Sequence, residues 1–220
     1  MNKYFIIALG VGLSTLTSCH LDVAPTSYVE ATDSNNAIHN DLELNAMRNG
    51  IYSSFRSTFY GVNSQPSEVM CDGFNAATGY SNNYGQIHRT DVTFTSSDYD
   101  TKDLWESMYS AIKDYNIFIS SAQNYGNANA ESKADADLYA GEALCFRAYS
   151  YMELVRHFAK AYNSTSASSD LGVPLVIAYN QLEKPHRATV AKVYEQIKAD
   201  LDLAASLGIA ARKASCVLNW

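Results

Sequence analysis

The sequence lacks the motifs by which most enzymes and metal-binding proteins are recognised. Its four cysteines include no Cys-x-x-Cys pair, and no two of its five histidines stand at the spacing of metal ligands. It has no Gly-x-Ser-x-Gly, no Gly-x-x-x-x-Gly-Lys and no His-Glu-x-x-His motif. The sequence therefore offers no recognised catalytic or metal-binding motif, and we expect the protein to carry no cofactor or metal ion.

Positive charge is also scarce, since 16 lysines and arginines stand against 23 aspartates and glutamates. The formal net charge of −7 argues against nucleic-acid binding, because the phosphates of such a partner require a basic surface. After the N-terminal segment, no apolar run approaches the ~20 residues that a membrane-spanning helix needs. Any tie to a membrane should therefore come from the N-terminal segment.

That N-terminal segment is typical of a bacterial lipoprotein signal. Lys3 precedes an apolar run that ends in Leu16-Thr17-Ser18-Cys19, which has the pattern of a lipobox. We predict cleavage before Cys19, acylation of that residue and export of the rest of the chain. The predicted parts are a signal peptide, 1–18, and a polar tether, 19–40. The alternative is a transmembrane anchor with an incidental cysteine, which the short apolar run disfavours.

Four long stretches show apolar residues at spacings of three and four, as on the buried face of an amphipathic helix. The predicted helices are 41–60, 101–123, 132–162 and 189–207. We expect Gly61 to end the first helix, and Thr101 and Thr189 to cap the second and the fourth. The buried stripe of the first helix includes Phe55 and Phe59. Together these patterns predict an all-α fold of tetratricopeptide-like helical hairpins, an α-solenoid.

Three stretches between these helices lack the helical period. Residues 62–97 contain several glycines, asparagines and aromatic residues, and they predict a long irregular insertion. Residues 124–129 predict a polar turn. Residues 171–176 predict a short extended element, because Gly172 and Pro174 both oppose helix. Long loops in compact domains are often functional, so the insertion is the first region in which to seek a ligand site.

Five segments, taken in order, resemble the SusD/RagB family of outer-membrane nutrient-binding lipoproteins. The most specific is Gly141-Glu142-Ala143-x-x-x-Arg147-Ala148-x-x-Tyr151, which is similar to the GEA-x-x-x-RA-x-x-Y element of that family. The other four are Asn49-Gly50-Ile51-Tyr52, Leu104-Trp105-x-x-x-Tyr109-x-x-Ile112-x-x-x-Asn116, Gly172-Val173-Pro174-Leu175-Val176 and Arg187-x-Thr189-Val190-x-x-Val193-Tyr194-x-x-Ile197-x-x-Asp200-Leu201. Each segment alone is a weak signal, whereas their common order and spacing make a strong one.

The resemblance implies a helical scaffold at the outer membrane that captures a glycan or another nutrient. It also implies a partner, a TonB-dependent SusC-like transporter that receives the ligand, and it implies no catalysis. In this family ligands contact aromatic and polar residues outside the helical repeats, and only residues 62–97 offer such a region here. The candidate ligand-binding residues are Asp72, Phe74, Tyr80, Asn82 and Tyr84. Sugar C–H faces would stack on the rings while Asp and Asn bind hydroxyls; packing of the rings within the loop is the alternative.

The resemblance fades after Gly208. The family continues with a further helical pair, which residues 209–220 do not match. We therefore predict a SusD-like N-terminal helical domain at 41–208 and a divergent or truncated tail at 209–220, as in a truncated or frameshifted product or a fragment. A solenoid without its next helical pair should expose apolar residues of its last helix and should oligomerise or dissolve poorly. The residues expected to be exposed are Val193, Ile197 and Leu201.

Two other functions remain open at the level of sequence. The first is a structural or adhesive surface lipoprotein that binds a protein partner through its helical repeats. The second is an exported glycoside hydrolase, which would need two carboxylates across a cleft. The sequence does not exclude the hydrolase, because carboxylates that meet in a cleft can come from distant parts of a chain, but no residue pattern favours it. Binding to glycans distinguishes the nutrient-binding protein from the first alternative, and release of reducing sugar would identify the second.

Overall fold

The computed structural model describes residues 36–71, 73–74, 84–88 and 99–209. The predicted signal peptide, Cys19 and most of the tether therefore lie outside the described residues. In the described part, helices dominate and the only strands are two short ones, so the predicted all-α architecture is confirmed. Within the same residues, no helix has both the length and the apolar character required to cross a membrane.

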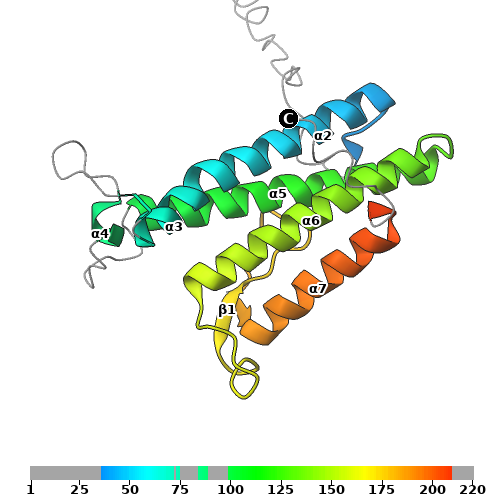
Figure 1. The fold of residues 1–220 in the computed structure, drawn as a ribbon. Helices are drawn as coiled ribbons and strands as arrows, with labels where there is room; N and C mark the ends of the chain where they lie inside the picture. The colour runs from blue at the N-terminus through cyan, green and yellow to red at the C-terminus, as the bar shows by residue number, and fades with distance from the viewer. Residues whose placement is uncertain (1–35, 72, 75–83, 89–98, 210–220) are drawn as a thin grey trace, which may run out of the picture. The chain divides into compact units, whose positions relative to one another are not determined.

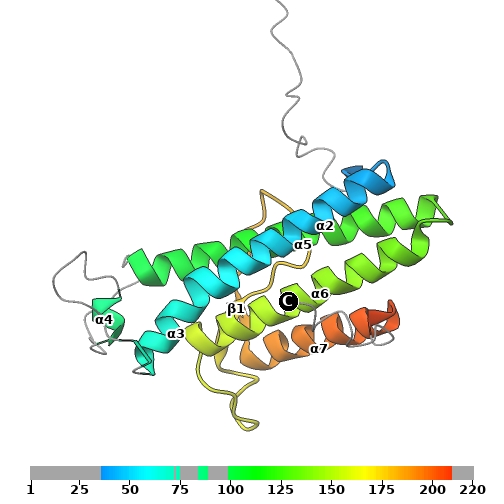
Figure 2. The same ribbon diagram turned by 45° about the horizontal axis from the view of Figure 1, so that its top comes forward.

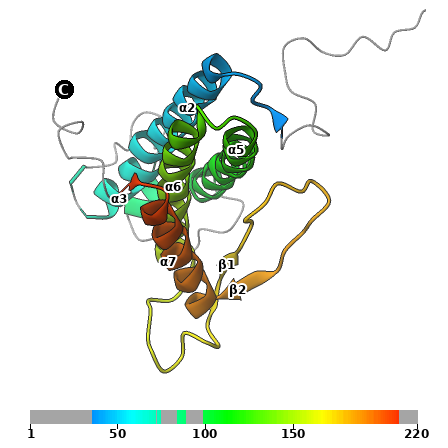
Figure 3. The same ribbon diagram turned by 90° about the vertical axis from the view of Figure 1, so that its right-hand side faces the viewer.

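The two longest helices, α5 (Tyr99–Ala128) and α6 (Lys133–Phe158), form an antiparallel hairpin at the centre of the domain (Figure 1). Helix α2 (Asp41–Arg56) crosses α5 and α6, and α7 (Val190–Ser206) packs along another side of α6 (Figure 2). Viewed end-on, α6 lies between α2, α5 and α7 (Figure 3). Because three helices cover it, α6 buries residues around most of its circumference, including Glu142, Arg147 and Glu153.

The first helix does not end at Gly61, contrary to the prediction. From α2 the chain continues as a π-helical stretch, η2 (Ser57–Asn63), and then as α3 (Ser64–Met70). Proline lacks an N–H group and crowds the carbonyl four residues before it, so Pro66 disfavours a regular α-helix through this region. The wider turns of η2 end at Asn63, three residues before that proline. The irregular insertion therefore starts after Met70 and contains a further short helix, α4 (Gly85–His88).

The bounds of the central helices also differ from the predicted ones. Helix α5 starts at Tyr99, so Thr101 lies inside the first turn and does not cap it, and its end extends through the predicted polar turn to Ala128. Gly126 permits this extension, because a β-carbon there would lie 2.9 Å from Cβ of Ala136 on α6. Helix α6 ends at Phe158, four residues before the predicted end.

The last helix and the extended element agree with the sequence. The side chain of Thr189 accepts a hydrogen bond from the Lys192 N–H and caps α7, as predicted. The extended element forms β1 (Leu171–Pro174), which pairs antiparallel with β2 (Arg187–Thr189) through Leu171 opposite Thr189. Gly208, just after α7, has a φ of 98°, which suits the glycine that commonly follows a helix end.

Two apolar clusters hold the helices together. The first joins α2, α5 and α6 and includes Leu44, Ile51, Tyr115, Phe118 and Leu144. The second joins α5, α6, α7 and β1 and includes Met108, Ile112, Tyr151, Val173 and Val193. The expected exposure of α7 is wrong for Val193 and Ile197, which α6 and the strands cover, whereas Leu201 is exposed.

Candidate ligand-binding site

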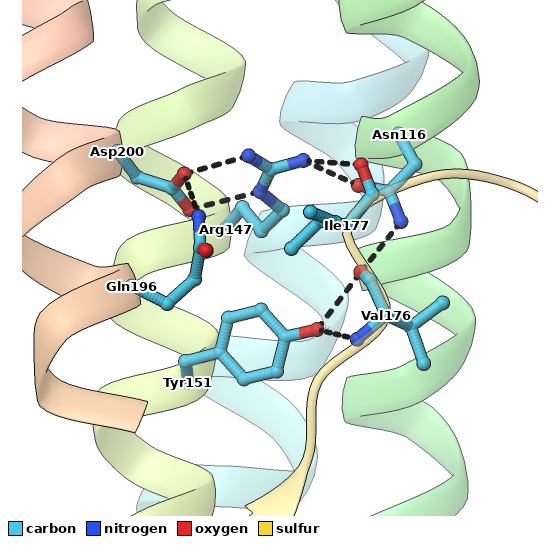
Figure 4. Close-up of polar contacts among 7 residues, drawn as sticks. All are labelled: Asn116, Arg147, Tyr151, Val176, Ile177, Gln196 and Asp200. Carbon is cyan, nitrogen blue, oxygen red and sulfur yellow. Dashed lines mark hydrogen bonds and ion pairs between the residues drawn. The ribbon is translucent and has the colours of Figure 1, made fainter. Parts of the chain in front are cut away.

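Arg147 of α6 lies at the centre of a buried polar network between α5, α6 and α7 (Figure 4). Its Nε and Nη2 donate to the two carboxylate oxygens of Asp200 on α7, at 2.8 and 2.6 Å. Its Nη1 donates to Oδ1 of Asn116 on α5 at 2.7 Å and to the carbonyl of Ile177 at 3.1 Å. Arg147 is 6% exposed and Asp200 2% exposed, so solvent and salt screen this ion pair only weakly.

The same network fixes the chain that follows β1. The amide of Asn116 donates to the carbonyl of Val176 at 2.8 Å. The Tyr151 hydroxyl donates to that carbonyl at 2.8 Å and accepts from the Val176 N–H at 2.6 Å (Figure 4). Tyr109 of α5 donates to the carbonyl of Pro174 at 2.8 Å. Side chains from two helices therefore replace the strand partner that these backbone groups would otherwise require.

A second buried ion pair joins α2 to α6. Arg48 donates through Nε and Nη2 to the two carboxylate oxygens of Glu142, at 2.6 and 2.7 Å. The guanidinium also lies 4.2 Å from the ring centroid of Tyr139, within cation–π range. Glu142 is buried, whereas Arg48 retains some contact with solvent. This two-point contact fixes both the distance and the rotation of α2 relative to α6.

Polar residues of the segments that carry the family resemblance meet in these contacts. They are Asn116, Glu142, Arg147, Tyr151 and Asp200. The sequence analysis placed these residues in family-like segments but assigned them no role, because their partners lie on other helices. Each is buried and hydrogen-bonded within the protein, so they position the scaffold and leave ligand contact to other residues.

Burial raises the pKa of Tyr151 to about 12, which predicts a loss of stability at alkaline pH. Between about pH 10 and pH 12 the unfolded chain would release this proton and the folded chain would keep it. The free energy of unfolding should therefore fall by about 1.4 kcal/mol per pH unit from this group. The Tyr151→Phe variant lacks the group, so its deficit relative to wild type should shrink across this range in urea titrations. Parallel pH profiles for the two proteins would contradict this assignment.

Among the predicted site residues, Tyr84 is held by contacts on both sides. Its backbone N–H donates to Oδ2 of Asp100 at 3.1 Å, and its hydroxyl donates to Oε1 of Gln65 at 3.0 Å. Burial, followed by the charge of Asp100, raises the pKa of the Tyr84 phenol. Its φ of 59° lies in the left-handed region, which is costly for a residue with a side chain. Tyr84 therefore links α3 to the start of α5 in a strained backbone conformation.

Phe74, by contrast, projects into solvent. Its side chain is 61% exposed, and its backbone N–H donates to the carbonyl of Glu68 at 3.3 Å. Gly73 makes a similar bond at 2.8 Å, and a β-carbon at Gly73 would lie 2.6 Å from the Glu68 carboxylate. The backbone beside this ring is thus bound to α3, while the ring itself remains available to a ligand.

The structure leaves the other predicted site residues without a test. Asp72, Tyr80 and Asn82 lie outside the described residues. Two exposed apolar side chains that the sequence analysis did not select flank the insertion: Met70 at the end of α3 and Tyr99, 77% exposed, at the start of α5. The sequence signal that could have pointed to Tyr99 was its position next to the insertion. The apolar stripe of the helix did not show whether Tyr99 faces solvent. This end of the domain therefore presents Phe74 and Tyr99 to solvent around the anchored Tyr84.

A second aromatic surface, which we call the aromatic groove, lies between α2 with η2 and α6. Its volume is about 810 Å³, and it is lined by Tyr52, Ser53, Phe55, Arg56, Tyr60 and Phe146. The Phe55 ring stacks between the rings of Phe59 and Phe146, with centroids 5.3 and 4.3 Å away. Tyr60 is 69% exposed. The sequence analysis missed this groove because the spacing of Phe55 and Phe59 predicts only a buried stripe.

Both surfaces offer the flat apolar faces of aromatic rings. In the aromatic groove, the side chains of Ser53 and Arg56 can hydrogen-bond to hydroxyl groups. Across residues 36–71, 73–74, 84–88 and 99–209, no group of three or more His, Cys, Asp or Glu side chains is placed to hold a metal ion. The antiparallel helices define a tetratricopeptide-like helical scaffold.

Comparison with known proteins identifies the family. The profile of SusD-like proteins, described as starch-binding and associating with the outer membrane, matches residues 20–213, and the chain therefore belongs to the SusD-like family. No functionally curated protein matches the chain significantly. The five segments that resembled SusD/RagB proteins thus led to the correct family.

Solved structures agree with this assignment. A SusD superfamily protein from Bacteroides thetaiotaomicron is 25% identical, with a TM-score of 0.62 over 75% of this chain and 36% of that one. A putative sugar binding protein from Bacteroides vulgatus is 22% identical, with a TM-score of 0.62 over 78% of this chain and 38% of that one. A SusD homolog from B. thetaiotaomicron is also 22% identical, with a TM-score of 0.58, and is covered over 32% of its length. The chain spans about a third of the length of these structures.

Proposed function

We propose that this protein is a lipid-anchored surface protein that captures an oligosaccharide and passes it to a TonB-dependent SusC-like transporter in the outer membrane. The observation that carries this proposal is the family match, because the family is described as starch-binding and associating with the outer membrane. The match starts at residue 20, directly after Cys19, the residue that we propose to be acylated. The protein would bind and transfer its ligand without chemical change.

We place the ligand site at the insertion, around Phe74, Tyr84 and Tyr99. The exposed rings of Phe74 and Tyr99 would stack on sugar faces, while Tyr84 holds the insertion against α3 and α5. Asp72, Tyr80 and Asn82, which the sequence puts on the same insertion, would add hydroxyl and ring contacts. Tyr84 is then a positioning residue, since its hydroxyl and backbone N–H already have partners within the protein.

Affinity electrophoresis through gels that contain starch or another polysaccharide tests this function. The purified protein should migrate more slowly in at least one polysaccharide gel than in a gel without polysaccharide. The Phe74→Ala variant should bind roughly two- to twelvefold more weakly, because one aromatic stacking contact contributes about 0.5–1.5 kcal/mol. Tyr162→Ala removes an exposed tyrosine outside this site and should bind as wild type does. Equal retardation of all three proteins would place the ligand elsewhere, and no retardation in any gel would oppose glycan binding.

The transporter partner is proposed from the family resemblance. Its gene would be expected beside the gene of this protein, and co-purification of the two proteins from outer membranes would support the partnership.

A further inference from the structure

A small aromatic pocket, which we call the Trp105 pocket, opens between the start of α5 and the end of α6. Its volume is about 400 Å³, and it is lined by Thr101, Lys102, Trp105, Glu106 and Phe158. The Trp105 and Phe158 rings meet edge to face, with centroids 4.9 Å apart and an interplanar angle of 86°. Both rings pack against the apolar cluster of α5, α6 and α7 but are only partly buried. The fold therefore fixes an aromatic wall that still borders solvent.

The polar side chains of the pocket can turn toward a ligand. Lys102 and Glu106 form an ion pair across one helical turn, but their nearest atoms are 3.7 Å apart, beyond hydrogen-bond distance. Their side chains are 58% and 62% exposed, and such a pair contributes little to stability. Together with the Thr101 hydroxyl, they supply a cationic donor, an anionic acceptor and a group that can both donate and accept.

The Trp105 pocket is next to the proposed ligand site on the surface of α5. Tyr99 precedes Lys102 by three residues and Glu106 by seven, so these exposed side chains share one side of the helix. Six residues separate Tyr99 from Trp105, which is ~9 Å along the helix axis. The pocket lies at the end of the α5–α6 hairpin where α3 and α4 are found (Figure 1). An extended ligand that stacks on Tyr99 would therefore meet this pocket next.

The charges of the pocket favour a neutral, polyhydroxylated ligand. An anion would be repelled by Glu106 and a cation by Lys102, whereas a neutral ligand meets neither cost. A purely apolar ligand would remove water from both charged groups without replacing its hydrogen bonds. A sugar unit can place its C–H face on the rings and its hydroxyl groups on the charged pair.

We propose that the Trp105 pocket is a second sugar subsite, which binds a further unit of the oligosaccharide held at the insertion. This inference rests on the proposed function and extends its site along α5. Trp105 and Phe158 supply the apolar wall, and Lys102 and Glu106 bind hydroxyl groups. Because the two subsites are separated by about 9 Å of helix, the ligand is a neutral oligosaccharide of several units.

Fluorescence of Trp105 tests the contact, because Trp105 and Trp220 are the only tryptophans. The Trp220→Phe variant isolates Trp105 and is titrated with oligosaccharides of the polysaccharide that retards the protein in gels, starch first. Binding should change the intensity of Trp105 emission and lower its quenching by acrylamide, and both effects should saturate. The corresponding monosaccharide should have a much smaller effect at the same concentration, since one unit cannot occupy both subsites.

A paired substitution removes the charged groups of the pocket and leaves its rings in place. Lys102→Ala combined with Glu106→Ala should bind the oligosaccharide roughly two- to twelvefold more weakly, as expected for the loss of about one hydrogen bond. The control, Lys192→Ala combined with Glu195→Ala, breaks a similarly exposed pair on α7 and should bind as wild type does. Both paired variants should unfold at nearly the wild-type urea concentration.

The outcomes distinguish this inference from the function on which it rests. Retardation in polysaccharide gels, combined with unchanged Trp105 emission or with equal affinities of the two paired variants, would overturn the subsite and leave the function intact. No retardation in any gel would oppose the function and the subsite together. A change in Trp105 emission that persists in the Phe74→Ala variant, at higher oligosaccharide concentration, would support a subsite separate from the insertion.

Discussion

Replacing Arg147 by methionine should lower the free energy of unfolding by about 3–5 kcal/mol. The substitution leaves Asp200 buried and deprives it of a two-point ion pair, and it also removes the donors to Asn116 and Ile177. A charge that is 2% exposed cannot recover this loss by hydration. Urea unfolding followed by circular dichroism measures the change, and the loss should appear as a lower midpoint with an unchanged slope.

Two further variants separate this effect from a general loss of charge. Lys198→Ala breaks the ion pair with Asp202 on the exposed side of α7, and it should change stability by less than about 1 kcal/mol. Combining Arg147→Met with Asp200→Leu removes both charges and should recover part of the lost stability. If Arg147→Met cost no more than Lys198→Ala, the buried network would not stabilise the fold as we describe.

Replacing Arg48 by alanine should lower the free energy of unfolding by about 2–3 kcal/mol. Its guanidinium is the two-point partner of the buried Glu142 carboxylate and also contacts the Tyr139 ring. The expected loss is smaller than for Arg147 because Arg48 borders solvent, so water can partly hydrate the remaining carboxylate. Chemical unfolding of wild type and variant provides the measurement.

A double-mutant cycle tests whether this loss comes from the pair itself. Glu142→Gln alone and together with Arg48→Ala should reveal a coupling energy well above the error of unfolding experiments. Arg48→Lys retains the charge but not the planar two-point geometry, so it should recover only part of the stability. Additive effects of the two single substitutions would mean that Arg48 contributes through its ring contact instead.

The sequence predicted those helices whose signals are local. For α7, the period of apolar residues and the cap at Thr189 are contained in one stretch of chain, and the predicted and observed bounds differ by one residue. The fold class could also be predicted from local signals, because each amphipathic helix needs another helix to cover its apolar stripe. Recognition of the family rested on the order of several such local signals.

The sequence failed where distant packing overrides local preference. A glycine at position 61 would usually end an exposed helix, yet Thr58 and Asn63 beside it are buried against other elements, and the helical path continues. The polar turn predicted at 124–129 is helical because Gly126 packs closely against Ala136. Neither contact could be inferred from the neighbouring sequence.

The candidate site shows the same limit. Composition and glycine content predicted an insertion and put Phe74 in it. The structure shows that the Phe74 ring is exposed, and its contact with a ligand stays a prediction. They could not show that Tyr84 is anchored, since its partners Gln65 and Asp100 are nineteen and sixteen residues away. The sequence did not reveal the aromatic groove for a related reason. The spacing of Phe55 and Phe59 predicts a buried stripe, but it does not show how far another helix covers that stripe.

The π-helical stretch η2 determines the direction in which the rest of the first helix faces. Each residue of an α-helix advances the chain by ~100° of rotation, so the loss of one residue from 57–63 would turn α3 by that amount about its axis. Gln65 would then leave Tyr84, and the backbone that carries Phe74 would face another side of the domain. The length of η2 therefore determines the rotation of α3, and with it the orientation of the proposed sugar-binding end. Related chains with one residue fewer in η2 should present that end in a different orientation.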